Sequence, residues 1–190
     1  VAVGVLRPNG DTVETRLGKD EAYGAHRVGS VTKTFTTFLA LKLCNDGVIQ
    51  LNTKCGDLID RKILESVFKN PAAAAEMTLE QLLSHTAGLE YDDHNRQEAG
   101  LNLKTMQDRF VREGQVGNKY KHTSQPGDGI GSYSNAGVAV AAWMLEVAYN
   151  KKHGNETPVS FTQIMRDELF TKVFNLSEHT RISPGPTGDV

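Results

Sequence analysis

The chain has little net charge and no long apolar run, and both absences narrow its possible functions. Its 190 residues carry a formal net charge of −2 at pH 7, which gives no electrostatic reason to expect nucleic acid or an anionic membrane as a partner. No apolar run approaches the ~20 residues that a membrane-spanning helix needs, so we expect no membrane segment. The length is sufficient for one domain with its own hydrophobic core.

Sequence motifs for metals and cofactors are also missing. The chain has no HExxH, no CxxC and no glycine-rich phosphate loop, so we expect no cofactor. Asp92, Asp93 and His94 come closest to a metal-binding cluster, but they lie in a polar stretch without a further ligand at a suitable spacing. We interpret them as part of a solvated loop.

Cysteine is scarce, since Cys44 and Cys55 are the only two. Two cysteines cannot form a disulfide framework, so the sequence allows either one bridge or two buried free thiols, and we favour the free thiols. Asn155 and Asn175 each begin an N-glycosylation acceptor pattern, which is typical of secreted proteins.

Hydrophobic periodicity and turn residues predict a short hairpin followed by a helical region. Residues 1–7 and 12–17 alternate around the turn Pro8-Asn9-Gly10-Asp11, which is typical of a β-hairpin. Capping boxes that begin at Thr78 and Ser160 mark two helix starts. We expect helices over residues 30–45, 78–88, 103–113, 136–151 and 160–173, with a polar, irregular stretch between the first two. Apolar residues cover most sides of the helix 30–45, so we expect it to be largely buried.

The stretch Ser30-Val31-Thr32-Lys33 carries the main chemical signal. A serine and a lysine three residues apart on a helix project from the same face, which places a hydroxyl beside an amine that can activate it. If Ser30 begins the helix, its oxygen also lies near unpaired backbone N–H groups. The alternative interpretation is a capping serine and a solvated lysine. Ser66-Val67-Phe68-Lys69 repeats the spacing, but no long apolar helix follows it, and we interpret it as a coincidence.

Three later segments complete a recognisable pattern. They are Thr78 to Leu89, Pro126-Gly127 and Tyr133-Ser134-Asn135-Ala136-Gly137. In this order and spacing the chain closely resembles the superfamily of serine β-lactamases and penicillin-binding proteins. The nearest branch contains class C β-lactamases, D-alanyl-D-alanine carboxypeptidases and esterases. Residues 170–176 and His179-Thr180 resemble a further family segment. The resemblance implies an α+β fold of the β-lactamase/transpeptidase type.

The resemblance also implies roles for individual residues. Ser30 would be the nucleophile that attacks an amide, lactam or ester carbonyl and forms an acyl-enzyme. Lys33 and Tyr133 are the candidates for the base that takes its proton, and the two could share one proton. Asn135 would bind the substrate amide or the lysine, and it is also a candidate N-cap of the helix 136–151. His85 is interpreted as structural, because the resemblance gives it no catalytic role.

Two strands are too few for this fold, because a lone hairpin cannot support a buried helix on its face. The family's third motif, Lys/His-Thr/Ser-Gly on a sheet strand, is absent, and Thr187-Gly188 comes too early in the chain to represent it. We therefore expect residues 1–190 to be the front portion of one β-lactamase-like domain, with the first sheet strands in 1–28 and the helical region in 29–183. A C-terminal companion segment or chain would supply the missing strands and one oxyanion-hole donor.

The leading hypothesis is thus a serine hydrolase that acts on a small-molecule, peptide or ester substrate. The alternative is a non-catalytic or assembly-forming β-lactamase-like protein that keeps the pocket for binding. A third hypothesis is a module that binds peptide or peptidoglycan reversibly. The sequence does not choose a substrate, since pocket walls in such folds come largely from loops outside the motifs.

Overall fold

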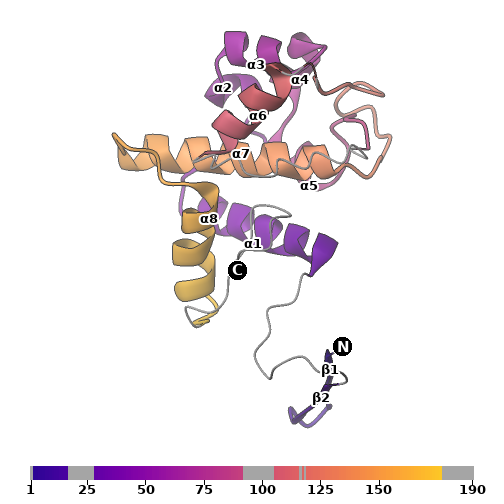
Figure 1. Cartoon of the computed structure of the whole chain (residues 1–190), viewed down its shortest axis with the longest axis vertical. Coiled ribbons are helices and arrows are strands. Elements are labelled where there is room, and N and C mark those ends of the chain that lie inside the picture. The colour runs from indigo at the N-terminus through magenta and orange to yellow at the C-terminus, as the bar shows by residue number, and fades with distance from the viewer. Residues whose placement is uncertain (1, 17–27, 92–104, 116, 118, 177–190) are drawn as a thin grey trace.

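The structure is a computed structural model that describes residues 2–16, 28–91, 105–115, 117 and 119–176. Figure 1 shows a body of packed helices and, standing apart from it, a two-stranded antiparallel hairpin. This is the combination of helical region and first strands that the sequence predicts. Some of the segments discussed above lie outside the described residues, namely 92–94, 179–180 and 184–190.

The hairpin consists of β1, Ala2–Leu6, and β2, Thr12–Arg16, as the valine-rich alternation predicts. Val5 lies opposite Val13 in the antiparallel register. The turn between the strands contains Gly10 with a φ of 89°, a conformation that glycine adopts without steric cost. Both valines are exposed, at 53% and 43% respectively, so this face of the hairpin is not covered by the described helices.

The first long helix, α1, spans Thr32–Asn45 and follows a single 3-10 turn, η1, Gly29–Val31. The α-helix therefore begins two residues later than predicted, and Ser30 lies in the tighter turn that leads into it. The prediction that this helix is buried on most sides was wrong for one face, since Phe38 and Leu41 are 54% and 49% exposed. The apolar pattern shows which faces of a helix favour burial, but the described segments cover only part of the apolar surface of α1.

The central helix of the body is α7, Asn135–His153. Its middle is completely buried, with no exposed surface on Val140, Ala141, Trp143, Met144 and Leu145. It packs against α1, against α5, Leu79–Leu83, and against α6, Met106–Gln115. A helix that is apolar on all sides is expected at the centre of a domain, and the apolar run after residue 135 correctly predicts this one.

The stretch between α1 and α5 is helical rather than irregular. It contains α2, Cys55–Leu58, α3, Arg61–Val67, and α4, Pro71–Glu76. The carboxylate of Asp60 accepts the N–H of Lys62 at 2.8 Å to cap α3, and Asn70 caps α4 in the same way. Such helices are too short for a periodic pattern to emerge, and their caps are the signal that the sequence does contain.

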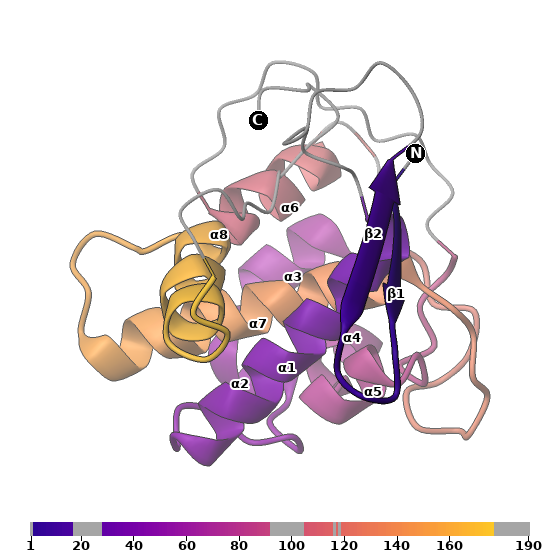
Figure 2. The same ribbon diagram turned by 90° about the horizontal axis from the view of Figure 1, so that it is seen from below.

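The remaining predicted helices are present with shifted ends. The expected capping box of Thr78 and Gln81 begins α5, but the helix ends at Leu83 rather than near residue 88. The last helix, α8, Phe161–Ile164, continues as a π-helical segment, η2, Met165–Thr171. α7 contacts both α1 and α8, and α1 also contacts η2, so these helices pack against one another (Figure 1, Figure 2). Among the described helices, none has the length and apolar composition required to span a bilayer.

Two buried glutamates connect the helices in different ways. Glu168 of η2 accepts hydrogen bonds from Lys42 of α1, Tyr149 of α7 and Lys172 at 2.7–3.1 Å. Burial alone raises its pKa, but these three donors outweigh burial and lower the pKa to about 2. Glu146 of α7 instead accepts only backbone N–H groups, and burial raises its pKa to about 7. Two lysines therefore stabilise the charge of Glu168, whereas Glu146 is hydrogen-bonded by the N–H groups of Met106 and Phe161.

The two cysteines are free thiols, as favoured from the sequence. Cys55 is fully buried, and its Sγ lies 3.3 Å from the Sδ of Met144 on α7. Cys44 is half-buried on α1. Burial raises the pKa of both thiols, so neither has the character of a reactive thiolate.

Candidate active site

Three of the predicted site residues meet in the structure. The Oγ of Ser30 lies 2.7 Å from the hydroxyl oxygen of Tyr133, and the Nζ of Lys33 donates a hydrogen bond to the same Oγ at 3.1 Å. The amine also lies 4.9 Å from the centroid of the Tyr133 ring. Ser30 and Tyr133 are 103 positions apart in the sequence, so only the fold can bring them together.

The start of α1 positions the serine and the lysine. Gly29 has a φ of 55°, in the left-handed region that glycine tolerates, and this allows the chain to enter the 3-10 turn that contains Ser30. Lys33 follows in the first turn of α1, on the same face. Ser30 is exposed and Lys33 is half-buried, which leaves the serine oxygen open to a substrate.

The start of α7 positions the tyrosine. Tyr133 directly precedes Ser134, whose Oγ accepts the N–H of Gly137 at 3.0 Å and caps the helix. The Oγ of Ser134 also donates to the backbone carbonyl of Glu90 at 2.8 Å, which fixes the entry to α7. Ser30 therefore lies at the N-terminal end of α1, where the helix dipole favours negative charge, and the Tyr133 hydroxyl reaches it from the segment that precedes α7.

Tyr133 is the site residue with a clear electrostatic shift. Hydrogen bonding with Lys33, and secondly with Ser30, lowers the pKa of its hydroxyl below the ordinary value. Its side chain is 42% exposed, so burial opposes this shift only weakly. A tyrosine whose anion is favoured by an adjacent amine, and which touches a serine hydroxyl, has the geometry of a general base.

The structure adds His85 to the site as a residue that positions Tyr133. Its ring lies 4.7 Å from the tyrosine ring, centroid to centroid, and its Nδ1 accepts the N–H of Ser134 at 3.1 Å. Its carbonyl accepts the N–H of Ser132 at 2.9 Å, so His85 binds both neighbours of the tyrosine. The φ of His85 is 62°, which is uncommon for a residue other than glycine and indicates a constrained turn.

The protonation state of His85 follows from these contacts. Burial, and then the charge of Lys33, lower the pKa of the imidazole. The neutral ring is therefore favoured, with Nδ1 as acceptor and the proton on Nε2. The sequence indicates a turn at Ser84-His85-Thr86-Ala87-Gly88, but it does not indicate that His85 contacts the ring of Tyr133.

The structure corrects one expectation for Asn135. This residue is the first of α7 and half-buried, whereas the N-cap is the preceding Ser134. Because Ser134 is the cap, Asn135 does not have the capping role, although the residue does make interactions. Its proposed contact with substrate stays a prediction.

A cavity of about 380 Å³ begins beside Lys33 and His85. Its far wall is apolar and includes the exposed Phe38 and Leu41 of α1 together with Val138 of α7. No cluster of three or more potential metal ligands occurs within the part of the chain that the structure describes. The chemistry available at this site is therefore that of a hydroxyl, an amine and a phenol beside an apolar hollow.

Three solved structures share the fold of this chain. A D-stereospecific amidohydrolase from Streptomyces sp. has a TM-score of 0.63 at 20% identity, over 89% of this chain and 48% of its own. An octameric penicillin-binding protein homologue from Pyrococcus abyssi has a TM-score of 0.50 at 19% identity, over 75% and 30%. A protein assigned as a 6-aminohexanoate-dimer hydrolase from Bacillus anthracis has a TM-score of 0.51 at 20% identity, over 77% and 39%.

These likenesses establish the fold, and the chain spans about half or less of the length of each structure. No curated protein matches the chain. A sequence model of the β-lactamase family, in contrast, matches residues 3–188, which is nearly the whole length. The chain therefore belongs to the β-lactamase family.

Proposed function

We propose that this chain carries the nucleophile of a serine hydrolase of the β-lactamase and DD-peptidase type, in the class C branch. The observation that supports the proposal is the contact of the Ser30 oxygen with both Lys33 and Tyr133, at 3.1 and 2.7 Å. A serine hydroxyl is unreactive at neutral pH unless an adjacent base takes its proton, and this arrangement provides one. Tyr133 as base is the feature that favours the class C branch.

In the proposed reaction, the phenolate of Tyr133 takes the proton of Ser30 as the serine Oγ forms a bond to the substrate carbonyl carbon. Tyr133 then gives this proton to the departing nitrogen or oxygen as the amide, lactam or ester bond breaks, which leaves an acyl group on Ser30. A water molecule then takes the place of the leaving group. Tyr133 takes a proton from this water as it attacks the acyl carbonyl carbon, and returns a proton to the Oγ of Ser30 as the bond between the acyl group and the serine breaks. Lys33 keeps the phenolate stabilised throughout by its positive charge.

The N–H of Ser30 is suited to bind the oxyanion that forms on the carbonyl oxygen. The N–H groups of Val31 and Thr32 are already paired with the carbonyls of Val28 and Gly29 in the 3-10 turn, and the dipole of α1 favours negative charge at this end. The Ser30 N–H would be one donor of the oxyanion hole, and the second would come from a strand supplied by a companion segment. Asn135, at the start of α7, would hold the substrate amide.

The proposal includes a companion segment because α1 has an uncovered apolar face. Phe38 and Leu41 are about half exposed beside the cavity that begins at Lys33, and apolar surface of this kind is costly to leave in water. Further sheet strands that pack on this face would cover it and close the site. The proteins of similar fold are roughly two to three times as long as the part that this chain matches, which gives room for such strands.

For the substrate we propose an amide, because of what two of the similar proteins are named for. One is called an amidohydrolase with D-stereospecificity and the other a hydrolase of a 6-aminohexanoate dimer. The octameric penicillin-binding protein homologue favours the alternative, an assembly-forming protein that keeps the pocket for binding. The two functions differ in whether Ser30 forms a covalent bond.

Intact-mass spectrometry with a broad serine-acylating probe separates these functions. We expect the protein, in the presence of its companion segment, to gain one probe mass that peptide mapping assigns to Ser30. The variant Ser30→Ala should gain none, while Ser66→Ala, which removes the serine of the second Ser-x-x-Lys segment, should label like the unmodified protein. Absence of an adduct at Ser30 in a folded, complete protein would exclude the hydrolase and leave the binding function.

A further inference from the structure

A short segment, residues 121–124, pairs with the part of the chain that leads towards the candidate active site. The carbonyl of Lys121 accepts the N–H of Glu90 at 3.0 Å, and the N–H of Lys121 donates to the Glu90 carboxylate at 3.0 Å. The N–H of Thr123 donates to the carbonyl of Gly88 at 2.7 Å. These hydrogen bonds hold the segment, which we call the His122 segment, against the helical body.

The residues on the other side of this pairing support Tyr133. The carbonyl of Glu90 accepts a hydrogen bond from the Oγ of Ser134 at 2.8 Å. The ring of Tyr91, the next residue, lies 5.9 Å from the ring of Tyr133, centroid to centroid. The His122 segment therefore holds two adjacent residues that contact the candidate base or its neighbour.

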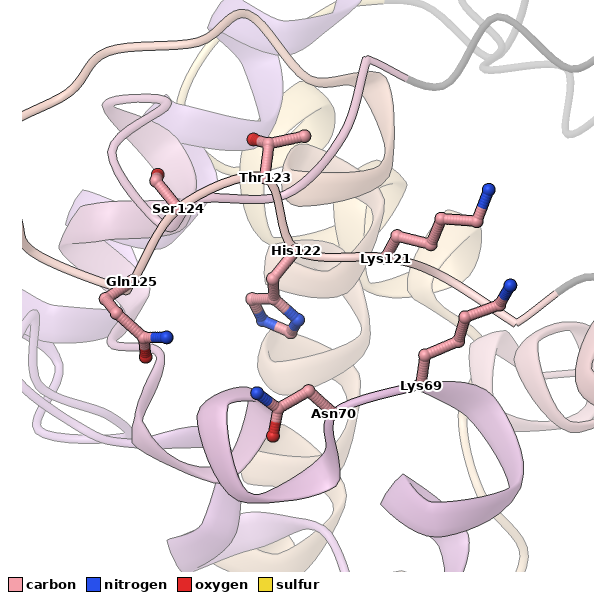
Figure 3. Close-up of a pocket in the computed structure, with 7 residues that line it drawn as sticks. All are labelled: Lys69, Asn70, Lys121, His122, Thr123, Ser124 and Gln125. Atoms are coloured by element: carbon pink, nitrogen blue, oxygen red, sulfur yellow. The ribbon is translucent and has the colours of Figure 1, made fainter.

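His122 itself has a buried imidazole. Both ring nitrogens are inaccessible to solvent and have no hydrogen-bond partner within the described part of the chain. The ring lies 6.1 Å from the ring of Phe68, and in the cavity drawn in Figure 3 it turns towards Asn70. A charged imidazole has two N–H donors, and burial of a charge and two donors without acceptors is costly. The closed arrangement therefore accommodates the neutral ring and excludes the charged one.

The charged residues of the surrounding segments do not reverse this preference. Burial lowers the pKa of the His122 imidazole, and the charge of Glu90 opposes this shift only in part. One oxygen of Glu90 is already bonded to the N–H of Lys121. The amines of Lys69 and Lys121 extend away from the ring in Figure 3, and their positive charge disfavours the imidazolium.

We propose that the His122 segment is an acid-sensitive support of Tyr133, which opens when His122 is protonated. Solvent must reach the imidazole before the ring takes up a proton, because both nitrogens are covered in the closed form. Once the segment separates, Glu90 and Tyr91 lose their attachment and no longer hold the base in place. Lys121 and Thr123 are exposed, so the segment lies at the surface and can open while the core stays packed. This device does not depend on the proposed hydrolysis.

The pH range of the opening follows from the two forms of the imidazole. A histidine in water titrates near pH 6.5, whereas the closed form keeps His122 neutral to lower pH. The stability that the neutral ring gives to the closed form is therefore present above pH 6.5 and lost as the pH falls from there. Between pH 7.5 and pH 5 the ratio of open to closed form should rise by up to about thirty-fold.

Hydrogen exchange of single backbone amides, followed by NMR in the full chain, measures this ratio. After correction for the intrinsic exchange rate at each pH, opening at the amides of Glu90 and Thr123 should increase by about ten- to thirty-fold from pH 7.5 to pH 5. The amide of Met144, at the buried centre of α7, should not follow. An increase below about three-fold would mean that the segment stays closed, and an equal increase at Met144 would mean that the whole body opens. Either result overturns the proposal.

A matched pair of variants identifies the titrating group. His122→Phe keeps a flat ring beside Phe68 and removes both nitrogens, so opening should be the same at pH 7.5 and pH 5. His153→Phe makes the same exchange at an exposed histidine on α7 and should retain the full increase. Circular dichroism checks that both variants are folded, and His122→Gln serves as a second neutral replacement. An increase that persists without His122 would assign the opening to another group.

The ring signals of Tyr133 test the connection to the candidate base. They should change between pH 7.5 and pH 5 in the unmodified protein and change less in His122→Phe, where Glu90 and Tyr91 stay attached. Any effect of His85 on the tyrosine ring is the same in both proteins and cancels in the comparison. Equal changes in the two proteins would show that the His122 segment does not support Tyr133.

Discussion

Two segments of this chain have the same spacing of serine and lysine, but they lie at opposite ends of their helices. Ser30 lies at the start of a long helix, whereas Ser66 lies in the last turn of α3, where its hydroxyl donates to the carbonyl of Ile63 at 2.7 Å. Lys33 is in the helix beside its serine, but Lys69 has already left α3. The N-terminal end of a helix favours negative charge and the C-terminal end does not, so the position of Ser30 fits the proposed nucleophile and that of Ser66 does not.

The third residue strengthens this difference. Tyr133 reaches Ser30 from the segment before α7, whereas among the described residues the Ser66 hydroxyl bonds only the carbonyl of Ile63. The Ser-x-x-Lys spacing alone therefore does not distinguish the proposed nucleophile. Ser30 differs from Ser66 in the end of the helix at which it lies and in its contact with the Tyr133 hydroxyl.

Exchanging each serine for alanine should give the largest contrast. In Ser30→Ala we expect amide hydrolysis by the complete protein to fall by about 10⁴-fold or more, because removal of a nucleophile leaves only binding and oxyanion stabilisation. Ser66→Ala should keep full turnover, and thermal melts should show that both variants are folded. Comparable losses in the two variants would mean that position on the helix does not decide reactivity.

Removing the phenol tests the second base. Tyr133→Phe keeps the ring that packs on His85 but deletes the hydroxyl that contacts Ser30, so we expect acylation to slow by about 10²–10⁴-fold. In the unmodified protein, the acylation rate should rise with pH up to the lowered pKa of this phenol. Stopped-flow acylation across pH measures both effects, and an unchanged pH profile in Tyr133→Phe would assign the base elsewhere.

Replacing Lys33 and Lys69 one at a time should give a smaller difference in the acylation rate. Lys33→Gln removes the charge that favours the Tyr133 anion, and we expect acylation to slow by at least about ten-fold, with the dependence on Tyr133 shifted to higher pH. Lys69→Gln leaves Ser30 untouched and should acylate normally. A normal rate in Lys33→Gln would show that the amine does not act on the phenol.

The smallest effect is expected at His85. His85→Gln retains a side chain that can accept the N–H of Ser134, whereas His85→Ala does not, so we expect a loss of a few fold in the first and about ten-fold in the second. Because the pKa of the native imidazole is lowered, the unfolded state binds protons more readily below pH 6.5. His85 thus contributes stability that is present above pH 6.5 and lost as the pH falls from there.

This pH dependence has its own measurement. Urea unfolding of the unmodified protein between pH 7.5 and pH 5 should show a decline in the free energy of unfolding that is smaller in His85→Gln. A decline of the same size in both proteins would mean that other groups cause it and that His85 is not held neutral by its contacts.

Much of the helical body could be predicted from the sequence, because long apolar runs report burial directly. The run after residue 135 predicted α7, and the capping patterns at Thr78 and Ser160 predicted two helix starts. Only Thr78 forms the reciprocal capping box, since the Gln163 side chain bonds Asp167 instead of returning to Ser160. The three short helices between α1 and α5 were missed, since four to seven residues give no periodicity. The exposed face of α1 was also missed, because a sequence reports which residues favour burial but not which partner is present.

In the candidate site, too, some contacts could be predicted from the sequence and others could not. Ser30 and Lys33 are close in sequence, so helix geometry alone predicts their contact. The contact with Tyr133 rested on resemblance, since nothing local indicates a pairing over 103 positions. The role of His85 as a support for Tyr133 depends on a ring contact and a backbone hydrogen bond, and no residue pattern encodes either of them.

The carboxylate of Glu146 has a consequence for local opening of the fold. Its two oxygens accept the N–H of Met106 at 2.8 Å and of Phe161 at 2.7 Å, which are the first residues of α6 and α8. Two helices that do not follow one another in the chain are thus fastened to α7 through one side chain. Loss of either attachment leaves a buried oxygen unpaired, so the first amides of α6 and α8 should exchange with deuterium at a common rate, as a single cooperative unit.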